Sequence, residues 1–226
     1  MTRGIFIAGN ESALCRAVEA ETAKRVERYT TALIPNRFAG TPKASAQSSE
    51  KRVVLEWNPS SPISARTLVL AAENRLDRID EAFLVCSPPL IHNSAANSVA
   101  ELSLADVEVM INDHIKGWFF LVKELAAVFA DRKHGTLALV FSDTGTVTGK
   151  DETADILAPS ALASFRTLTQ GLLSAAHNEP YITMGFSSSD SGNDAGFAAF
   201  IYKCIDEGNK RSNGKLHKFG KFNFFK

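Results

Sequence analysis

The sequence lacks the features that mark a membrane-embedded, disulfide-bonded or metal-binding protein. Its cysteines are Cys15, Cys86 and Cys204, which form neither a CxxC pair nor a cluster with histidine at metal-ligand spacing. We therefore expect reduced thiols and no metal site. No long apolar run is present, and Met1 leads into a strand-like segment without the pattern of a signal peptide. These absences predict a soluble, cytoplasmic protein that does not bind membranes.

An excess of charge of one sign is also absent. Lys and Arg together number 25, as do Asp and Glu, so no overall field attracts nucleic acid or an anionic membrane. Basic residues gather near the C-terminus, from Lys210 to Lys226, but phenylalanines interrupt them. We interpret this segment as solvated surface, and we expect no binding to nucleic acid.

Short apolar runs alternate with longer segments of helical period, which is typical of repeated βαβ units and a parallel sheet. Strands are expected at residues 5–8, 29–34, 53–56, 82–86, 136–141 and 182–186, and near 214–219. Helices are expected from residue 12, near 63–76, and over 104–131, 159–177 and 194–207. The pattern predicts a doubly wound, Rossmann-like α/β fold with a parallel sheet of about seven strands.

The whole chain, residues 1–226, is expected to form this single domain. Residues 35–52 are poor in apolar side chains and rich in Pro, Ser, Ala and Lys. We therefore expect a flexible loop there, within the domain.

Several stretches carry a resemblance to a known family. They are Ala8-Gly9 in the first turn, residues 76–85 around the fourth strand, Gly117–Val122, Gly135–Ser142, and Ala158–Ala163. In this order and spacing they resemble the short-chain dehydrogenase/reductase family over nearly the whole chain. The resemblance implies a Rossmann fold, a nicotinamide dinucleotide cofactor, oxidoreduction between ketones and alcohols, and a homodimer or homotetramer.

By this resemblance, the dinucleotide site would be lined by Gly9, Ala13, Arg37, Glu56 and Cys86. The family's first turn is rich in glycine because phosphates bind backbone N–H groups at a helix N-terminus. Here Gly9 is retained, but Ala13 and Cys15 stand at the second and third glycine positions. The carboxylate of Glu11 in the same turn would repel phosphates.

Two other cofactor positions, at Arg37 and Cys86, also depart from the family. Asn36 and Arg37 stand where an acidic residue would end the second strand, and an Arg there favours NADP over NAD if either binds; the alternative is an ordinary exposed Arg in a loop. Glu56 takes the place of the acidic residue that contacts adenine. Cys86 begins Cys-Ser-Pro-Pro in place of Asn-Asn-Ala-Gly, and the two prolines remove two backbone donors.

The family's chemistry uses a Tyr proton donor, a Lys four residues later, a Ser and an Asn. The alignment puts Leu157 at the Tyr position and Ala161 at the Lys position. The Ser position falls on Asp143 or Thr144, and the Asn position on His114. We therefore predict a short-chain dehydrogenase/reductase-like protein that lacks this activity and is retained for binding or assembly. The alternative is an NAD(P)-dependent oxidoreductase in which His114 and Asp143 act as acid and base.

The resemblance further implies that helices near 104–131 and 158–177 pair with a twofold mate. Five aromatic side chains could supply apolar surface for this contact: Trp118, Phe119, Phe120, Phe129 and Phe165. The alternative is that they pack inside the domain.

Overall fold

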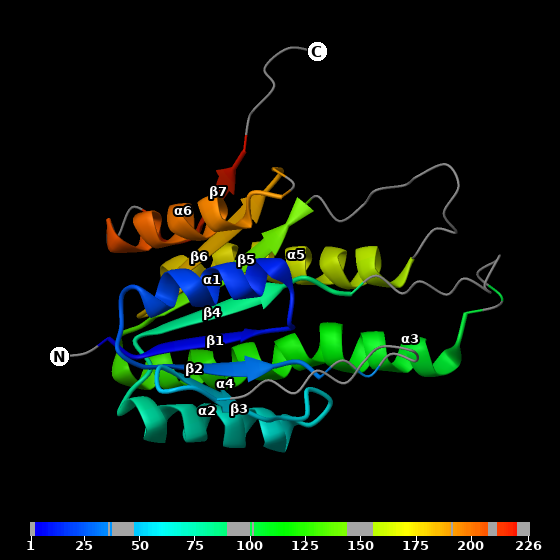
Figure 1. Ribbon diagram of the computed structural model, residues 1–226, viewed down its shortest axis with the longest axis horizontal. Coiled ribbons are helices and arrows are strands. Elements are labelled where there is room, and N and C mark those ends of the chain that lie inside the picture. The colour runs from blue at the N-terminus through cyan, green and yellow to red at the C-terminus, as the bar shows by residue number, and fades with distance from the viewer. Residues whose placement is uncertain are drawn as a thin grey trace, which may run out of the picture.

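The computed structural model describes residues 3–35, 37, 48–89, 100, 102–143, 156–190, 192–207 and 212–220, and its strands form one parallel sheet (Figure 1). The strands are β1 (Ile5–Gly9), β2 (Tyr29–Leu33), β3 (Arg52–Leu55), β4 (Glu81–Cys86), β5 (Thr136–Ser142), β6 (Ile182–Ser188) and β7 (Lys215–Phe219). Their order is β3-β2-β1-β4-β5-β6-β7. The predicted doubly wound α/β fold with seven parallel strands is confirmed. Most of the expected flexible loop lies outside the described residues, so that prediction stays open.

Helices cover both faces of the sheet, because successive residues of a strand point to opposite sides. Ile5 and Ile7 of β1 pack in one core with α1 (Ala13–Ala23) and α6 (Asp194–Asp206). Phe6 and Ala8 pack on the other face with α2 (Pro62–Leu76), α4 (Gly117–Arg132) and α5 (Leu157–Ala175). Figure 1 shows α1 and α6 on the side of the sheet opposite to α2 and α4.

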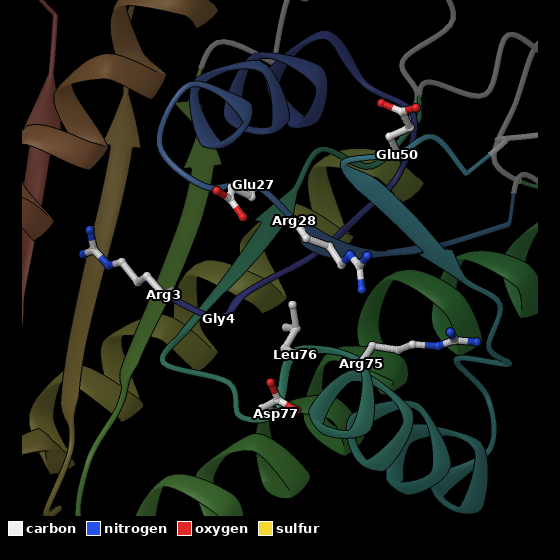
Figure 2. Close-up of a pocket in the computed structure, with 8 residues that line it drawn as sticks. All are labelled: Arg3, Gly4, Glu27, Arg28, Glu50, Arg75, Leu76 and Asp77. Carbon is white, nitrogen blue, oxygen red and sulfur yellow. The ribbon is translucent and has the colours of Figure 1, made fainter. Parts of the chain in front are cut away.

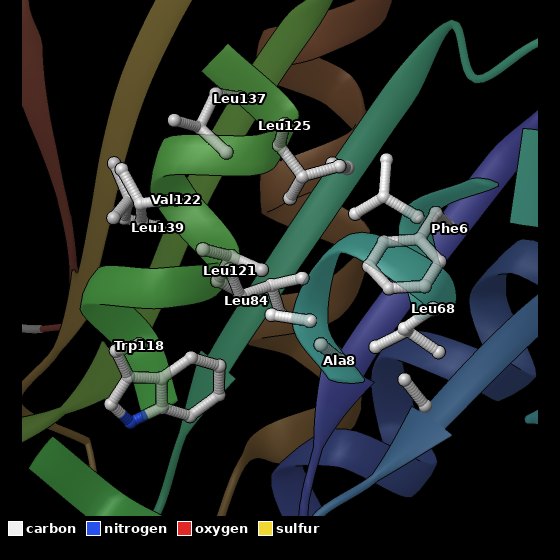
Figure 3. Close-up of a cluster of buried hydrophobic side chains, with 14 of the residues drawn as sticks. Phe6, Ala8, Leu68, Leu84, Trp118, Leu121, Val122, Leu125, Leu137 and Leu139 are labelled. Atoms are coloured by element: carbon white, nitrogen blue, oxygen red, sulfur yellow. The ribbon is translucent and has the colours of Figure 1, made fainter. Parts of the chain in front are cut away.

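Helix α4 supplies much of the second core. Trp118, Leu121 and Leu125 recur at helical spacing and face Leu84 and Leu139 of the sheet (Figure 3). All five are almost completely buried, and each buried side chain of this size contributes about 1.5–3 kcal/mol relative to an exposed one. Of the apolar residues whose spacing predicted this helix, Val122 and Leu125 are buried, whereas Ile111 and Phe119 are exposed. The face that packs on the sheet therefore also includes Trp118 and Leu121, which lay outside that set.

The long helix expected at 104–131 has a different local geometry in its middle. It begins as α3 (Leu104–Ile111), passes through a π-helical turn, η2 (Asn112–Lys116), and continues as α4. Just after this turn the helix passes close to the β3–α2 loop, since a Cβ on Gly117 would lie 2.6 Å from the Cβ of Pro59. A π turn rotates the side chains that follow it relative to an α-helix. Asp113 and His114 of this turn are both buried.

An ionic network joins the elements at the amino edge of the sheet. Arg3, which precedes β1, pairs with Glu81 at the start of β4 and with Asp206 at the end of α6. Asp206 also pairs with Arg25, which follows α1. Glu81 is only 4% exposed. Burial raises the pKa of its carboxyl group to about 7, although the Arg3 guanidinium lowers it in part.

We expect this carboxyl group to make stability depend on pH. Its pKa is raised in the folded protein, so the stability it contributes is fully present below its ordinary pKa of 4.5 and is lost as pH rises toward 7. As pH rises from 4.5 to 7, the ionisation of Glu81 should lower the free energy of unfolding by about 2–3 kcal/mol. Urea unfolding of Glu81→Gln should show a flatter pH dependence than the wild type.

The matched control is Glu27→Gln, which changes an exposed carboxylate in the α1–β2 connection. Its pH dependence should follow the wild type. Equal slopes for the wild type and Glu81→Gln would contradict the assignment to Glu81.

Candidate functional site

The strand order reverses between β1 and β4, so the loops that follow these two strands leave the sheet in opposite directions. In an open parallel sheet, ligands bind in the crevice that this reversal creates at the carboxyl ends of the strands. Residues Gly9 and Val85 pair side by side at this point. We use the name switch-point crevice for the ligand position that this topology predicts, at the carboxyl ends of β1 and β4.

The β1–α1 turn packs tightly on itself. A Cβ on Gly9 would lie 2.8 Å from Cys15 Sγ and 3.1 Å from the carbonyl oxygen of Val85, so a larger residue would force these groups to shift. Ser12 is the N-cap of α1, and its Oγ accepts a hydrogen bond from the Cys15 N–H at 3.1 Å. Ala13 is the first residue of the helix. One of the backbone donors that a phosphate would use is therefore already satisfied.

A side chain links the two turns that border the crevice. The Asn10 side-chain amide donates a hydrogen bond to the Ser87 carbonyl oxygen, which lies just beyond β4. Burial raises the pKa of the Cys15 thiol to about 12, and it also raises the pKa of Cys86 at the end of β4. Both thiols are therefore protonated near neutral pH, which suits packing and not nucleophilic chemistry.

Arg37 and Asp113 form an ion pair on the β2 side of the crevice. Arg37 Nε lies 3.5 Å from Asp113 Oδ2, and Arg37 Nη2 donates to Asn58 Oδ1 at 3.4 Å. The Asp113 side chain is 0% exposed. In the described part of the chain, neither of its carboxylate oxygens accepts a hydrogen bond. Burial raises the pKa of Asp113, and the charge of Arg37 opposes that shift.

Arg37 has an exposed side chain and pairs with Asp113 through Nε. Its assignment to a 2′-phosphate stays a prediction. Glu56 follows β3 and also has an exposed side chain. Sequence reasoning missed Asp113, since nothing in the apolar periodicity of the long helix distinguishes it from the exposed polar residues there.

The two positions that the resemblance assigns to Tyr and Lys lie in an apolar cluster. Leu157 and Ala161 are one helical turn apart at the start of α5, and both are buried. They pack with Ala158 and with Met110 of α3, and Ile115 covers the cluster in part. The helix was expected from residue 159, and it begins two residues earlier, at Leu157.

His114 and Asp143 lie in different electrostatic environments. His114 is buried in η2, and burial lowers its pKa to about 4, so its imidazole is neutral near pH 7. Asp143 follows β5 and forms an ion pair with Arg166 of α5, a partner that the sequence did not predict. Thr144, the other candidate at the Ser position, lies outside the described residues.

Figure 2 shows a second hollow, at the amino edge of the sheet and hence opposite to the crevice. Its volume is about 240 Å³. It is lined by Arg3, Gly4, Glu27, Arg28, Glu50, Arg75, Leu76 and Asp77. The three arginines are balanced by three carboxylates, and Figure 2 shows Arg3 pointing away from the other side chains. The hollow therefore has no preference for an ion of one sign.

An apolar groove of about 510 Å³ lies between α4 and α5. It is lined by Phe119, Ser164, Thr167, Leu168, Gly171 and Leu172. Among the residues that the structure describes, no group of three His, Cys, Asp or Glu side chains could hold a metal ion. Within those same residues, no helix is both long and apolar enough to span a membrane.

The burial of the thiols predicts their order of reaction. Cys204 on α6 is partly exposed, whereas Cys15 and Cys86 are buried. An aromatic disulfide reagent should therefore modify one thiol rapidly in the native protein and all three after denaturation. The Cys204→Ser variant should lose the fast phase. Rapid labelling of native Cys204→Ser protein would contradict the packing described for the two buried thiols.

No protein-family model and no curated protein sequence matches this chain. Solved structures do match along almost its whole length. A short-chain dehydrogenase/reductase from Serratia marcescens has 11% sequence identity and a TM-score of 0.68, with 96% of each chain covered.

Two further structures contain a dinucleotide. The NADH-dependent reductase A1-R′ complexed with NAD has 10% identity and a TM-score of 0.71, over 96% of this chain and 95% of that one. ElxO with NADP bound has 14% identity and a TM-score of 0.72, over 96% of this chain and 97% of that one. Identities this low establish the three-dimensional arrangement and not the activity. The chain therefore has the fold of the short-chain dehydrogenase/reductases.

Proposed function

We propose that this protein uses the short-chain dehydrogenase/reductase fold for assembly with a second copy of itself, without the ketone–alcohol chemistry that the resemblance implies. The observation that carries the proposal is the apolar cluster around Leu157 and Ala161. Hydride transfer to a carbonyl group leaves negative charge on oxygen, and a nearby donor must supply a proton. Leucine and alanine side chains cannot donate one.

The chain's tyrosines do not supply a substitute. Tyr29 belongs to β2, Tyr181 immediately precedes β6, and Tyr202 belongs to α6. Burial raises the pKa of Tyr202, whose hydroxyl group shares a hydrogen bond with Thr22 of α1. All three side chains are buried away from the first turn of α5.

The other titratable groups near the crevice do not favour the alternative of an atypical oxidoreductase. A proton donor works best when its pKa lies near the working pH. Burial lowers the pKa of His114 to about 4, so its imidazole carries no acidic proton of that kind near pH 7. The carboxylate of Asp143 is held by Arg166.

The exposed apolar side chains support assembly through α3, α4 and α5. Three of the five aromatic residues considered for this contact, Trp118, Phe129 and Phe165, are buried inside the fold. Phe119, however, is 50% exposed, and Leu104 and Ile111 on the same long helix are 81% and 47% exposed. Large apolar side chains left exposed to solvent are typical of an interaction surface.

The shape of the groove favours a second copy as the occupant. Phe119 protrudes at one side, while Ser164, Thr167 and Gly171 present small side chains at helical spacing on α5. A Cβ on Gly171 would have no neighbour within 4 Å. A twofold contact needs a protrusion and a complementary hollow on the same patch, and this surface has both.

We expect the wild-type protein to sediment as a dimer, with twice the 24.5 kDa mass of the chain. Phe119→Asp should sediment as a monomer, because a carboxylate would have to be desolvated in an apolar contact. Leu70→Asp is the matched control: Leu70 is also 50% exposed, but it lies on α2 and does not line the groove. A monomeric wild type, or a dimeric Phe119→Asp, would refute the assembly.

We also expect no consumption of NADPH or NADH by the purified protein with a panel of ketones and aldehydes. A conventional short-chain reductase, assayed in parallel, should consume NADPH or NADH with the same panel, which serves as the positive control. Turnover by the wild type that is lost in His114→Ala or Asp143→Asn would establish the atypical oxidoreductase instead.

A further inference from the structure

We infer that the chain's own side chains close the switch-point crevice to a nicotinamide dinucleotide, with the Asp113 carboxylate standing where Arg37 would otherwise receive a 2′-phosphate. This goes beyond the proposed function, since a protein that lacks a proton donor could still bind the cofactor. The inference rests on contacts at both ends of the crevice.

At the β2 end, the chain supplies its own anion. A 2′-phosphate bound to Arg37 would have to displace Asp113, whose oxygen lies 3.5 Å from the guanidinium nitrogen. The displaced carboxylate is fully buried and accepts no hydrogen bond from the described residues. It would be left as a buried charge without a partner, which strongly disfavours the exchange. A phosphate placed beside the intact pair would be repelled by the carboxylate.

At the β1–α1 turn, the groups that would bind pyrophosphate are engaged or missing. The Cys15 N–H is capped by Ser12 Oγ, and the Ser12 N–H donates to the Asn10 carbonyl oxygen at 2.8 Å. The Asn10 side chain then ties this turn to Ser87 on the other side of the crevice. Pro88 and Pro89, the next residues, have no N–H to offer.

The two ends share one physical character. In each, a group that a dinucleotide would contact is satisfied by a neighbour within the chain: Cys15 and Ser12 by residues of the same turn, and Arg37 by a residue far away in the sequence. Opening the crevice would break these contacts before any ligand contact formed. The residues present therefore do not fit the cofactor that the fold otherwise accommodates.

The test combines ligand binding with the stability of variants. The melting temperature of the wild type is measured with NAD, NADH, NADP and NADPH, each at about 5 mM, and no saturable shift is expected. A ligand present at 100 times its dissociation constant would raise the melting temperature by about 5 °C or more. A saturable rise with any of the four would overturn the inference.

The variants test whether Arg37 is held in an internal ion pair with Asp113 or is free to bind a ligand. Arg37→Ala should lower the melting temperature by about 3–6 °C, because it leaves the buried carboxylate of Asp113 without its partner. Arg37→Ala combined with Asp113→Asn should recover most of that loss. An unchanged melting temperature in Arg37→Ala would show that Arg37 is not held by Asp113, and would overturn the inference even if no dinucleotide binds.

Discussion

Parallel strands can pair only if each crossover leaves the sheet, passes over one face and returns, so a parallel sheet must have helices on both faces. In this protein that constraint determines the rest of the structure. The alternate residues of β1 and β4 enter two separate cores, one with α1 and α6 and one with α2, α4 and α5. The crossovers run in opposite directions on either side of β1 and β4, and the crevice follows from this topology alone.

A crevice that the topology creates carries no information about its use. Function depends on the side chains that the loops bring to it. Here those side chains interact mainly with one another: Asn10 with Ser87, Arg37 with Asp113, and Leu157 and Ala161 with Met110. These contacts are the observations on which the proposal of a closed crevice rests.

The elements that depend on local pattern could be predicted from the sequence. The strands are short buried runs, and their bounds agree with the prediction to within two residues. The Arg37–Asp113 and Asp143–Arg166 pairs could not be predicted, because each joins side chains from separate loops and helices. Asp113 lies in the π turn of η2. A pattern based on 3.6 residues per turn does not predict such a turn or the side-chain directions that follow from it.

The described residues place titratable groups in the interior and large apolar side chains at the surface. A buried carboxylate and two buried thiols lie around the crevice, while Leu104, Ile111 and Phe119 face solvent on the long helix. Covering a half-exposed side chain of this size gains about 1 kcal/mol, and twofold symmetry counts each one twice. Association itself costs on the order of 4–15 kcal/mol, a range that includes the roughly 6 kcal/mol from three such residues on two copies, so the proposed assembly also needs the α4–α5 groove. In that assembly, Phe119 of each copy would enter the groove of the other beside Gly171, and one twofold contact would fill two grooves.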